Sequence, residues 1–324
     1  MQSLVTVFGG GGFVGRHTVR ALAKQGHRIR VAVRRPHLIP ELKVMGDVGQ
    51  IELFQANIRD QASIDRALQG ATGVVNLVGV LYQTGRQTFQ SLQADGARTL
   101  AISAAKAGVD RFVQVSAIGA SATSPAKYAR AKAEGEAAVL KAVPTATVLR
   151  PSIVFGPEDD FFNRFAAMAA VAPALPLIGG GKTLFQPVYV ADVAKAIMAA
   201  LENPAHQGKT FELGGPSVYS FKRLLEIVRS ETDRNPLLLP VPWALAELIG
   251  SIGDLQTVIA PVIPPVLTTD QVRMLRDDNV VSKGALGLSD LGIESTPVES
   301  VVPDYLWRFR PGGQFGSRGA AAPT

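Results

Sequence analysis

The sequence LVTVFGGGGFVGRHTVRALAK, residues 4–24, decides the fold of this chain. Its first five residues form an apolar run typical of a buried strand, and a helical pattern follows the glycines. A glycine-rich turn between a strand and a helix indicates a dinucleotide-binding β-α-β unit. In such a unit Gly9 permits the tight turn, Gly12 lets backbone N–H groups approach a pyrophosphate, and Gly15 lets the helix pack close to the strand.

The rest of the first half alternates β-branched runs with helical patterns, which is typical of a parallel sheet covered by helices on both faces. We therefore predict an α/β fold with a doubly wound parallel sheet, a Rossmann fold. Asp60 is expected to cap the helix through Ile64 and Leu68, and Gly70 to end it. The predicted strands are residues 4–8, 28–33, 51–55, 73–77, 111–115 and 147–149.

After residue 151 the pattern loosens into connections rich in Pro and Gly, which predicts a smaller, mostly helical C-terminal lobe. A strand is expected at Thr210 to Leu213, and Asp192 is expected to cap a helix through Ile197, so part of this half should return to the first sheet. The predicted division is a core of residues 1–155 with 186–213, a lobe of 156–185 and 214–312, and a flexible tail of 313–324.

Composition excludes several classes of function. The 324 residues include no Cys, which excludes disulfides, thiolate metal sites and cysteine nucleophiles. The four histidines, at 17, 27, 37 and 206, have no metal-ligand spacing, so no metal site is predicted. Lys and Arg exceed Asp and Glu by 33 minus 27, or +6, but they form no basic block, which argues against a nucleic-acid partner.

No run of about 18 apolar residues is present, so no transmembrane helix is predicted. No signal or transit peptide is expected either. Apolar residues from Leu237 to Gly250, continued by Leu255 and Val258, recur at helical spacing. This stripe either packs on its own domain or lies against a partner subunit or an anionic lipid surface, with Trp243 as anchor and residues 262–266 as a stiff connection.

The second predicted strand ends in Val33-Arg34-Arg35, at the point where NAD-binding chains carry an acidic residue for the ribose 2′-hydroxyl. No carboxylate occurs before Glu41. Two guanidinium groups can instead hold a 2′-phosphate through charge-assisted hydrogen bonds. The sequence therefore favours NADP(H) over NAD(H), unless both arginines are ordinary solvated surface residues.

Tyr128 and Lys132 lie four residues apart on a helix predicted over Pro125 to Leu140, so both side chains share one face. An ammonium near a phenol lowers the pKa of the phenol, which would make Tyr128 a usable general acid or base. The alternative is a pair that only hydrogen-bonds a ribose or solvent.

In this order the motifs resemble the short-chain dehydrogenase/reductase superfamily, in its extended and atypical branches. The likeness covers nearly the whole sequence. Besides the glycine loop and the Tyr–Lys pair, it rests on Asn57 after the third strand, Asn76-Leu77-Val78-Gly79 after the fourth, Ser116 after the fifth, Leu149-Arg150-Pro151, and residues 187–194.

More narrowly, residues 267–281 and the Arg-rich end of the second strand resemble the nucleotide-binding (39 kDa-type) accessory subunit of respiratory complex I, NADH:ubiquinone oxidoreductase. This resemblance implies firmly bound NADPH, no turnover, and a structural role among the other subunits of complex I, at the junction of its peripheral and membrane arms. It also implies a peripheral place on the cytoplasmic side of a bacterial inner membrane, or on the matrix side in a mitochondrion. The nucleotide-binding residues it implies are Gly9, Gly12, Phe13, Val14, Gly15, Arg34, Arg35, Asn57, Val78, Ser116, Tyr128, Lys132 and Pro151.

One departure from the superfamily concerns catalysis. Active members of the extended branch usually carry a Ser or Thr one or two residues after the position of Ser116, and here those residues are Ala117 and Ile118. Neither Ser116 nor Ser121 is in that register, so the Tyr–Lys pair is a weakened proton-transfer site and inactivity is predicted. Two alternatives remain: an active NADP-dependent sugar-nucleotide epimerase, dehydratase or carbonyl reductase using Tyr128, and an NADPH-sensing regulator of a protein partner.

Overall fold

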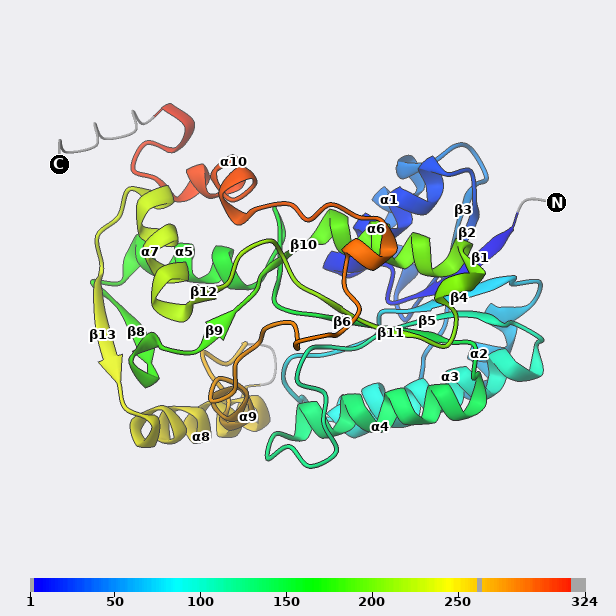
Figure 1. Ribbon diagram of the computed structural model, residues 1–324, viewed down its shortest axis with the longest axis horizontal. Helices are drawn as coiled ribbons and strands as arrows, with labels where there is room; N and C mark the ends of the chain where they lie inside the picture. Colours follow the sequence, from blue (N-terminus) through cyan, green and yellow to red (C-terminus); the bar gives the residue numbers. More distant parts are fainter. Residues whose placement is uncertain (1–2, 261–263, 316–324) are drawn as a thin grey trace.

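The computed structural model of the protein describes residues 3–260 and 264–315 and is built around a seven-stranded parallel sheet (Figure 1). The strand order is β11-β6-β5-β4-β1-β2-β3, so the chain runs outward from β1 in one direction and then crosses back to β4. The carboxyl ends of β1 and β4 therefore flank a topological switch point. The strands are β1 (Leu4–Phe8), β2 (Arg28–Val33), β3 (Ile51–Gln55), β4 (Gly73–Asn76), β5 (Arg111–Val115), β6 (Thr147–Pro151) and β11 (Thr210–Leu213).

Helices cover both faces of this sheet, which confirms the predicted doubly wound fold (Figure 1). One face packs against α1 (Phe13–Lys24) and α6 (Val190–Glu202), and the other against α2 (Gln61–Leu68), α3 (Asp95–Lys106) and α4 (Lys127–Ala142). The strands are apolar on both sides because both faces are buried.

Helix α2 begins and ends as predicted. The Asp60 carboxylate accepts a hydrogen bond from the N–H of Ala62 at 3.2 Å and so caps the helix. Gly70, two residues beyond the last helical residue, has a φ of +72°, a conformation that glycine adopts at low cost.

Among the described residues, the chain from Val154 onward adds a smaller set of helices and three two-stranded sheets around its own apolar cluster. The sheets pair β7 with β10, β9 with β12 and β8 with β13. Edge-to-face contacts among Phe161, Phe162, Phe165 and Phe221 form the centre of the cluster. The division of the chain into the two stated residue sets stays a prediction. The remaining elements are β7 (Val154–Phe155), α5 (Phe161–Val171), β8 (Ala174–Ile178), β9 (Leu184–Phe185), β10 (Val188–Tyr189), β12 (Tyr219–Ser220), α7 (Phe221–Thr232), β13 (Leu237–Val241), α8 (Trp243–Ile259), α9 (Thr269–Met274) and α10 (Pro303–Leu306).

The predicted helical pattern from Leu237 onward is wrong in its first five residues, which form strand β13 parallel to β8. Pro240 and Pro242 explain the difference, because proline removes a helical N–H and disfavours helical geometry in the residue before it. Helix α8 begins directly after Pro242. The smaller lobe is therefore less helical than its apolar spacing predicts.

Helix α8 does not bury its apolar stripe on its own domain. Leu248 is 58% exposed and Val258 is 77% exposed, and only Ala246 and two glycines of the helix are buried. Trp243, the predicted anchor, packs instead on Gly179, with the guanidinium of Arg276 5.3 Å from the centroid of its ring. The exposed apolar side chains of α8 are Leu245, Leu248, Ile252, Leu255, Val258 and Ile259.

Several predicted boundaries shift. Asp192 is not an N-cap, because α6 begins after Tyr189; Asp192 lies in the first turn and accepts a hydrogen bond from the N–H of Thr296 at 2.8 Å. The strand predicted over 73–77 ends at residue 76, the strand over 147–149 continues to 151, and the helix over 125–140 spans 127–142.

The predicted flexible tail is described only in part. Its first residues, Gly313–Phe315, form a 3₁₀ turn, whereas 316–324 lie outside the described residues, as do 261–263 of the predicted stiff connection. None of the described helices combines the length and apolar composition needed to span a bilayer. Within the same residues, no group of three or more His, Asp or Glu side chains is arranged to hold a metal ion.

Candidate functional site

The glycine loop after β1 turns sharply and lies against neighbouring backbone. Gly9 has a φ of +82°, and a Cβ there would lie 3.0 Å from the carbonyl carbon of Leu77. A Cβ at Gly15 would lie 2.4 Å from the carbonyl oxygen of Gly9, closer than atoms can approach. Both positions therefore require glycine, the first for its φ and the second for the approach of α1 to the loop.

Gly12 is different, because a Cβ there would meet only the carbonyl oxygen of Gly9, at 3.5 Å. The fold itself does not need glycine at this position. Gly12 is also the N-cap of α1 and supplies no side-chain hydrogen bond to the first N–H groups of that helix. Open space beside uncapped N–H groups at a helix N-terminus fits an anionic pyrophosphate.

Phe13 and Val14 open helix α1 and hold it in place. The Phe13 ring packs edge-on against His17, with 5.8 Å between ring centroids, and also lies against Gly156. Val14 packs on the apolar cluster beneath the sheet. Their side chains anchor the helix and leave its N-terminal end directed at the glycine loop.

Three arginines gather at the carboxyl ends of β2 and β3. Arg34 and Arg35 follow β2, and Arg59 follows β3. Burial and the positive charges of Arg59 and Arg35 lower the pKa of Arg34. None of the three has a carboxylate partner among the described residues; Glu41, the first acid after Arg35, pairs with Arg16. The Arg59 guanidinium donates to the backbone carbonyl of Arg86 at 2.7 Å, which holds it in place. Three guanidiniums gathered without a carboxylate fit a phosphate monoester.

Arg59 was missed by the sequence analysis, and Asn57 explains its position. The Asn57 side-chain oxygen accepts a hydrogen bond from the N–H of Arg59 at 3.1 Å, and the N–H of Asn57 donates to Ser63 Oγ at 2.9 Å. Asn57 thus shapes the turn after β3 and orients Arg59. Arg59 could have been identified from the sequence because the predicted strands β2 and β3 are adjacent, and their carboxyl ends lie at one edge of a parallel sheet.

Val78 and Pro151 lie at the carboxyl ends of β4 and β6. The N–H of Val78 donates to the side-chain oxygen of Asn76 at 3.1 Å, which holds Val78 beside Gly9. The carbonyl of Pro151 accepts a hydrogen bond from Ile118 at 3.0 Å. The first contact holds Val78 against the glycine loop, and the second joins the segments that follow β5 and β6.

Lys132 lies deep in the site with only 6% of its surface exposed. Its Nζ donates to the carbonyl of Val115 at 3.2 Å and lies 5.8 Å from the centroid of the Tyr128 ring. Burial lowers the pKa of Lys132 to about 8, against a smaller opposing effect of the Glu136 carboxylate. The lysine is thus placed as a hydrogen-bond donor at the end of β5.

The predicted lowering of the Tyr128 pKa is wrong. Burial, together with the negative charge of Asp270, raises the pKa of Tyr128 to about 12. The nearby lysine does not outweigh these two effects, because removing a phenolate from water is costly. At neutral pH the Tyr128 hydroxyl is therefore a neutral group suited to hydrogen bonding, and a poor general base.

Two buried oxygens at this end of the sheet have no hydrogen-bond partner among the residues that the structure describes: Ser116 Oγ, directly after β5, and Gln93 Oε1. Gln93 is 2% exposed and lies in a π-helical turn, Gln90–Ala94; its Nε2 donates to the carbonyl of Val80 at 2.8 Å. A Cβ at Gly79 would lie 3.5 Å from Lys132 Nζ and 3.6 Å from Gln93 Nε2, so both side chains border the same space.

Unpaired buried acceptors fit a ligand that brings its own hydroxyl or amide donors. Gln93 was missed by the sequence analysis, and no spacing pattern could have identified it. Ser121, considered there as a substitute hydroxyl, is hydrogen-bonded to Thr123 at 3.1 Å.

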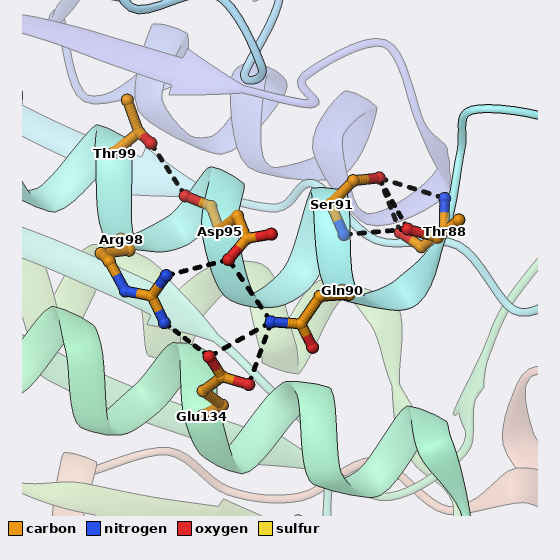
Figure 2. A network of polar contacts seen from close by, with 7 residues as sticks. All are labelled: Thr88, Gln90, Ser91, Asp95, Arg98, Thr99 and Glu134. Atoms are coloured by element: carbon orange, nitrogen blue, oxygen red, sulfur yellow. Dashed lines mark hydrogen bonds and ion pairs between the residues drawn. The ribbon is translucent and has the colours of Figure 1, made fainter.

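A polar network joins α4, the helix that carries Lys132, to α3 (Figure 2). Arg98 pairs with Asp95 at 2.9 Å and with Glu134 at 2.5 Å, and Gln90 Nε2 donates to Glu134 at 3.1 Å (Figure 2). Helix α4 also lies close to the π-helical turn before α3, where a Cβ at Gly135 would lie 2.1 Å from the carbonyl oxygen of Gln93. This packing fixes the position of α4, and the Lys132 ammonium takes no part in the network.

The structure thus brings the predicted residues to one edge of the sheet, around the switch point between β1 and β4. The glycine loop and the arginines lie on the β1-β2-β3 side, and Val78, Ser116, Pro151 and the Tyr–Lys pair on the β4-β5-β6 side. Such an edge is the usual ligand-binding place in doubly wound folds.

Some known proteins are similar to this chain in sequence, and some solved structures are similar to it in fold. Subunit 9 of the mitochondrial NADH dehydrogenase [ubiquinone] 1 alpha subcomplex is 39% identical in Arabidopsis thaliana, over 97% of this chain and 80% of the relative. The Mus musculus subunit is 36% identical over 95% of this chain and 80% of its own length. A ceramide reductase of Caulobacter vibrioides is 32% identical over 63% of this chain and 62% of that protein.

Among solved structures, the crystal structure of gox2253 has a TM-score of 0.72 at 22% identity, over 97% of this chain and all of that one. UDP-glucose 4-epimerase of Thermus thermophilus, in complex with NAD, has a TM-score of 0.60 at 21% identity, over 84% of this chain and 97% of that one. The sequence profile of one family matches residues 5–214, the sheet and its helices. The chain belongs to the NAD dependent epimerase/dehydratase family.

Proposed function

We propose that this chain is a non-catalytic, NADPH-holding accessory subunit of complex I, NADH:ubiquinone oxidoreductase. The observation that carries the proposal is the likeness, over nearly the whole chain, to subunits of the mitochondrial NADH dehydrogenase of a plant and a mammal. The likeness extends beyond residue 214, where the match to the family profile ends.

NADPH fits the residues at the carboxyl edge of the sheet. The open Gly12 and the N-terminus of α1 would receive its pyrophosphate. Arg34, Arg35 and Arg59 would hold its 2′-phosphate, and Lys132 would donate to the nicotinamide ribose, with Tyr128 and Ser116 beside it. When bound, NADPH would itself be a hydride donor.

The chemistry of Tyr128 supports holding the nucleotide without turnover. A phenol with a pKa near 12 is a poor proton acceptor at neutral pH. Ala117 and Ile118 offer no hydroxyl to orient a substrate beside it, and Ile118 is itself buried. The site therefore has donors and cations for binding but lacks an aligned proton-transfer pair.

The exposed apolar face of α8 is the surface that we propose meets another subunit of the complex, at a peripheral position on the membrane. Six large apolar side chains are exposed on this one helix, and apolar side chains gathered on one surface are typical of an interaction site. Helix α8 contains no Lys or Arg and carries Glu247 and Asp254, so it is not complementary to an anionic lipid surface. An apolar protein surface suits it better than the anionic lipid contact raised by the sequence.

Co-migration tests the subunit assignment. Membranes of the source organism are solubilised gently and separated by size, and this chain is followed with a specific antibody. We expect it in the fraction that carries NADH:ubiquinone oxidoreductase activity. Migration at the size of the free chain, 34.2 kDa, in every detergent tested would contradict the assignment.

One observation favours a second candidate, an NADPH-dependent reductase, because the 32% identical relative is a ceramide reductase. Its test is multiple-turnover oxidation of NADPH with carbonyl substrates. Turnover that is lost in Tyr128→Phe would favour the reductase over the accessory subunit.

A further inference from the structure

A segment of the C-terminal half crosses the carboxyl edge of the sheet. This segment, Leu267–Ser282, contains α9 and is called the strap below. Its hydrogen bonds reach residues that follow β4, β5 and β6 and one residue within β11. They join Gln271 to the carbonyl of Leu81, Asn279 to the carbonyl of Ile118, Ser152 to Asn279, and Ser282 to Glu212.

Asp270, at the start of α9, caps the helix that carries Tyr128 and Lys132. Its two carboxylate oxygens accept hydrogen bonds from the N–H groups of Lys127, at 2.6 Å, and Tyr128, at 2.9 Å. The residue at the N-cap position of α4 is Ala126, whose side chain has no hydrogen-bond acceptor. The strap therefore supplies, from 142 residues away, the cap that the local sequence lacks.

The position of Asp270 is itself fixed from two sides. Thr268 and Gln271 form a reciprocal capping box that sets the start of α9. Arg273 also donates to the carbonyl of Pro125 at 3.4 Å, just before α4. The cap on α4 is thus one contact of an ordered turn and does not depend on a single mobile side chain.

Helix α8 packs directly on the strap. A Cβ at Gly253 would lie 1.8 Å from the carbonyl oxygen of Leu267, and a Cβ at Gly250 would lie 2.7 Å from the N–H nitrogen of Thr269. Backbone contacts this close do not allow α8 to shift without moving the start of α9. The strap therefore joins the exposed apolar helix to the Tyr–Lys helix.

We propose that the strap closes the nicotinamide end of the nucleotide site, with Asp270 as the positioning residue that couples release of the nucleotide to the C-terminal half. This inference rests on the proposed function, because it takes NADPH as the ligand. Opening the strap removes the cap from α4 and frees its first turn, so that Tyr128 can move away from the ribose while Lys132 stays fixed by the packing of the following turns.

The test uses the full-length protein with Asp270→Ala, its conservative partner Asp270→Asn, and Asp277→Ala as the matched control. Asp277 is an exposed carboxylate of the same strap with no side-chain partner among the described residues. Two quantities are measured: amide exchange at Lys127 and Tyr128 in the nucleotide-free protein, and the rate at which bound NADPH dissociates into excess NADP. Far-UV circular dichroism checks that each variant is folded.

We expect Asp270→Ala to speed both the two amide exchanges and NADPH release by about three- to thirtyfold, as for loss of a helix cap. Asp270→Asn, which keeps one acceptor oxygen, should fall between it and the unaltered chain, and Asp277→Ala should match the unaltered chain. Unchanged release in Asp270→Ala, or equal changes in Asp277→Ala, would overturn the proposal.

The two measurements separate this inference from the proposed function. If the unaltered chain binds no NADPH, the proposed function and the coupling both fail, while the exchange measurement still reports the cap. If NADPH binds tightly and Asp270→Ala leaves its release unchanged, the coupling alone is wrong.

Discussion

Glu136 and Arg150 form a two-pronged ion pair that joins α4 to β6, with Arg150 Nε at 3.0 Å and Nη2 at 2.6 Å from the carboxylate oxygens. Glu136 is buried and lies four residues after Lys132, on the same face of the helix. A second carboxylate, Glu212 of β11, lies 3.7 Å from the same guanidinium. The pair therefore fixes the Lys132 face of α4 against the sheet.

Arg150→Met should destabilise the protein strongly, because it leaves the Glu136 carboxylate buried without a counter-charge. We expect a loss of about 3–5 kcal/mol in the free energy of unfolding, measured by urea denaturation at pH 7. The double variant Glu136→Leu/Arg150→Met should recover most of this loss. A single variant as stable as the unaltered chain would contradict the buried pair.

Lys132→Met should stabilise the nucleotide-free protein at neutral pH and weaken NADPH binding at the same time. The pKa of Lys132 is about 8 when folded and 10.5 when unfolded, so between these pH values the unfolded chain binds more protons and the free energy of unfolding rises with pH. Removing the buried ammonium should raise the free energy of unfolding by at most about 3 kcal/mol at pH 7. This increase should disappear above about pH 10, where the lysine is neutral in the folded protein.

Lys141→Met is the matched control for that experiment, since Lys141 is an exposed lysine in the last turn of the same helix. Its stability should change little at any pH. If Lys132→Met lowers the free energy of unfolding at pH 7, the buried charge of Lys132 does not destabilise the folded protein. The assignment of Lys132 as a buried donor kept for the nucleotide would then be wrong.

Gly12→Ala and Gly15→Ala should separate binding from folding. Gly12 has room for a methyl group, so its variant should keep the stability of the unaltered chain and lose at least about tenfold in NADPH affinity, because the methyl group fills the place of the pyrophosphate. Gly15→Ala should instead unfold at lower urea concentration, because its methyl group collides with the backbone of Gly9. Equal NADPH affinity in Gly12→Ala and the unaltered chain, by calorimetry, would contradict the pyrophosphate assignment.

Arg34→Ala/Arg59→Ala tests the preference for the 2′-phosphate. Each charge-assisted contact is worth about 1.5–3 kcal/mol, so NADPH affinity should fall by at least about a hundredfold while NADH affinity stays within a few-fold. Arg28→Ala, at the amino end of the same strand, is the control and should change neither affinity. A parallel fall for both nucleotides would mean that the arginines bind no 2′-phosphate.

Sequence alone predicted the sheet well, for a physical reason. Strands buried on both faces are short continuous apolar runs, and Gly9 and Gly70 mark turns that need positive φ. The same reasoning failed at Leu237 to Val241, where an apolar run fits either a helix or an edge strand and only the prolines decide. Apolar spacing also could not reveal that the outer face of α8 stays exposed.

The site was predictable only where its residues form local motifs. Gly9, Gly12 and Gly15 lie within one turn, and Tyr128 and Lys132 on one helix face. Arg59 reaches the site because β3 lies next to β2 in the sheet. Gln93 reaches it from a π-helical turn, and Asp270 contacts a residue 142 positions away in the sequence. The pKa of Tyr128 could not be predicted from its lysine neighbour, because burial and Asp270 decide it.

The identity of the nucleotide in the native protein tests the central claim most directly. The protein is purified from its source under native conditions, denatured in a chelator-free buffer, and the released small molecules are identified by mass. We predict about one NADP(H) per chain and no NAD(H). A site that releases no dinucleotide, in a protein that also fails to bind added NADPH, would contradict the account, as would release of NAD(H) alone.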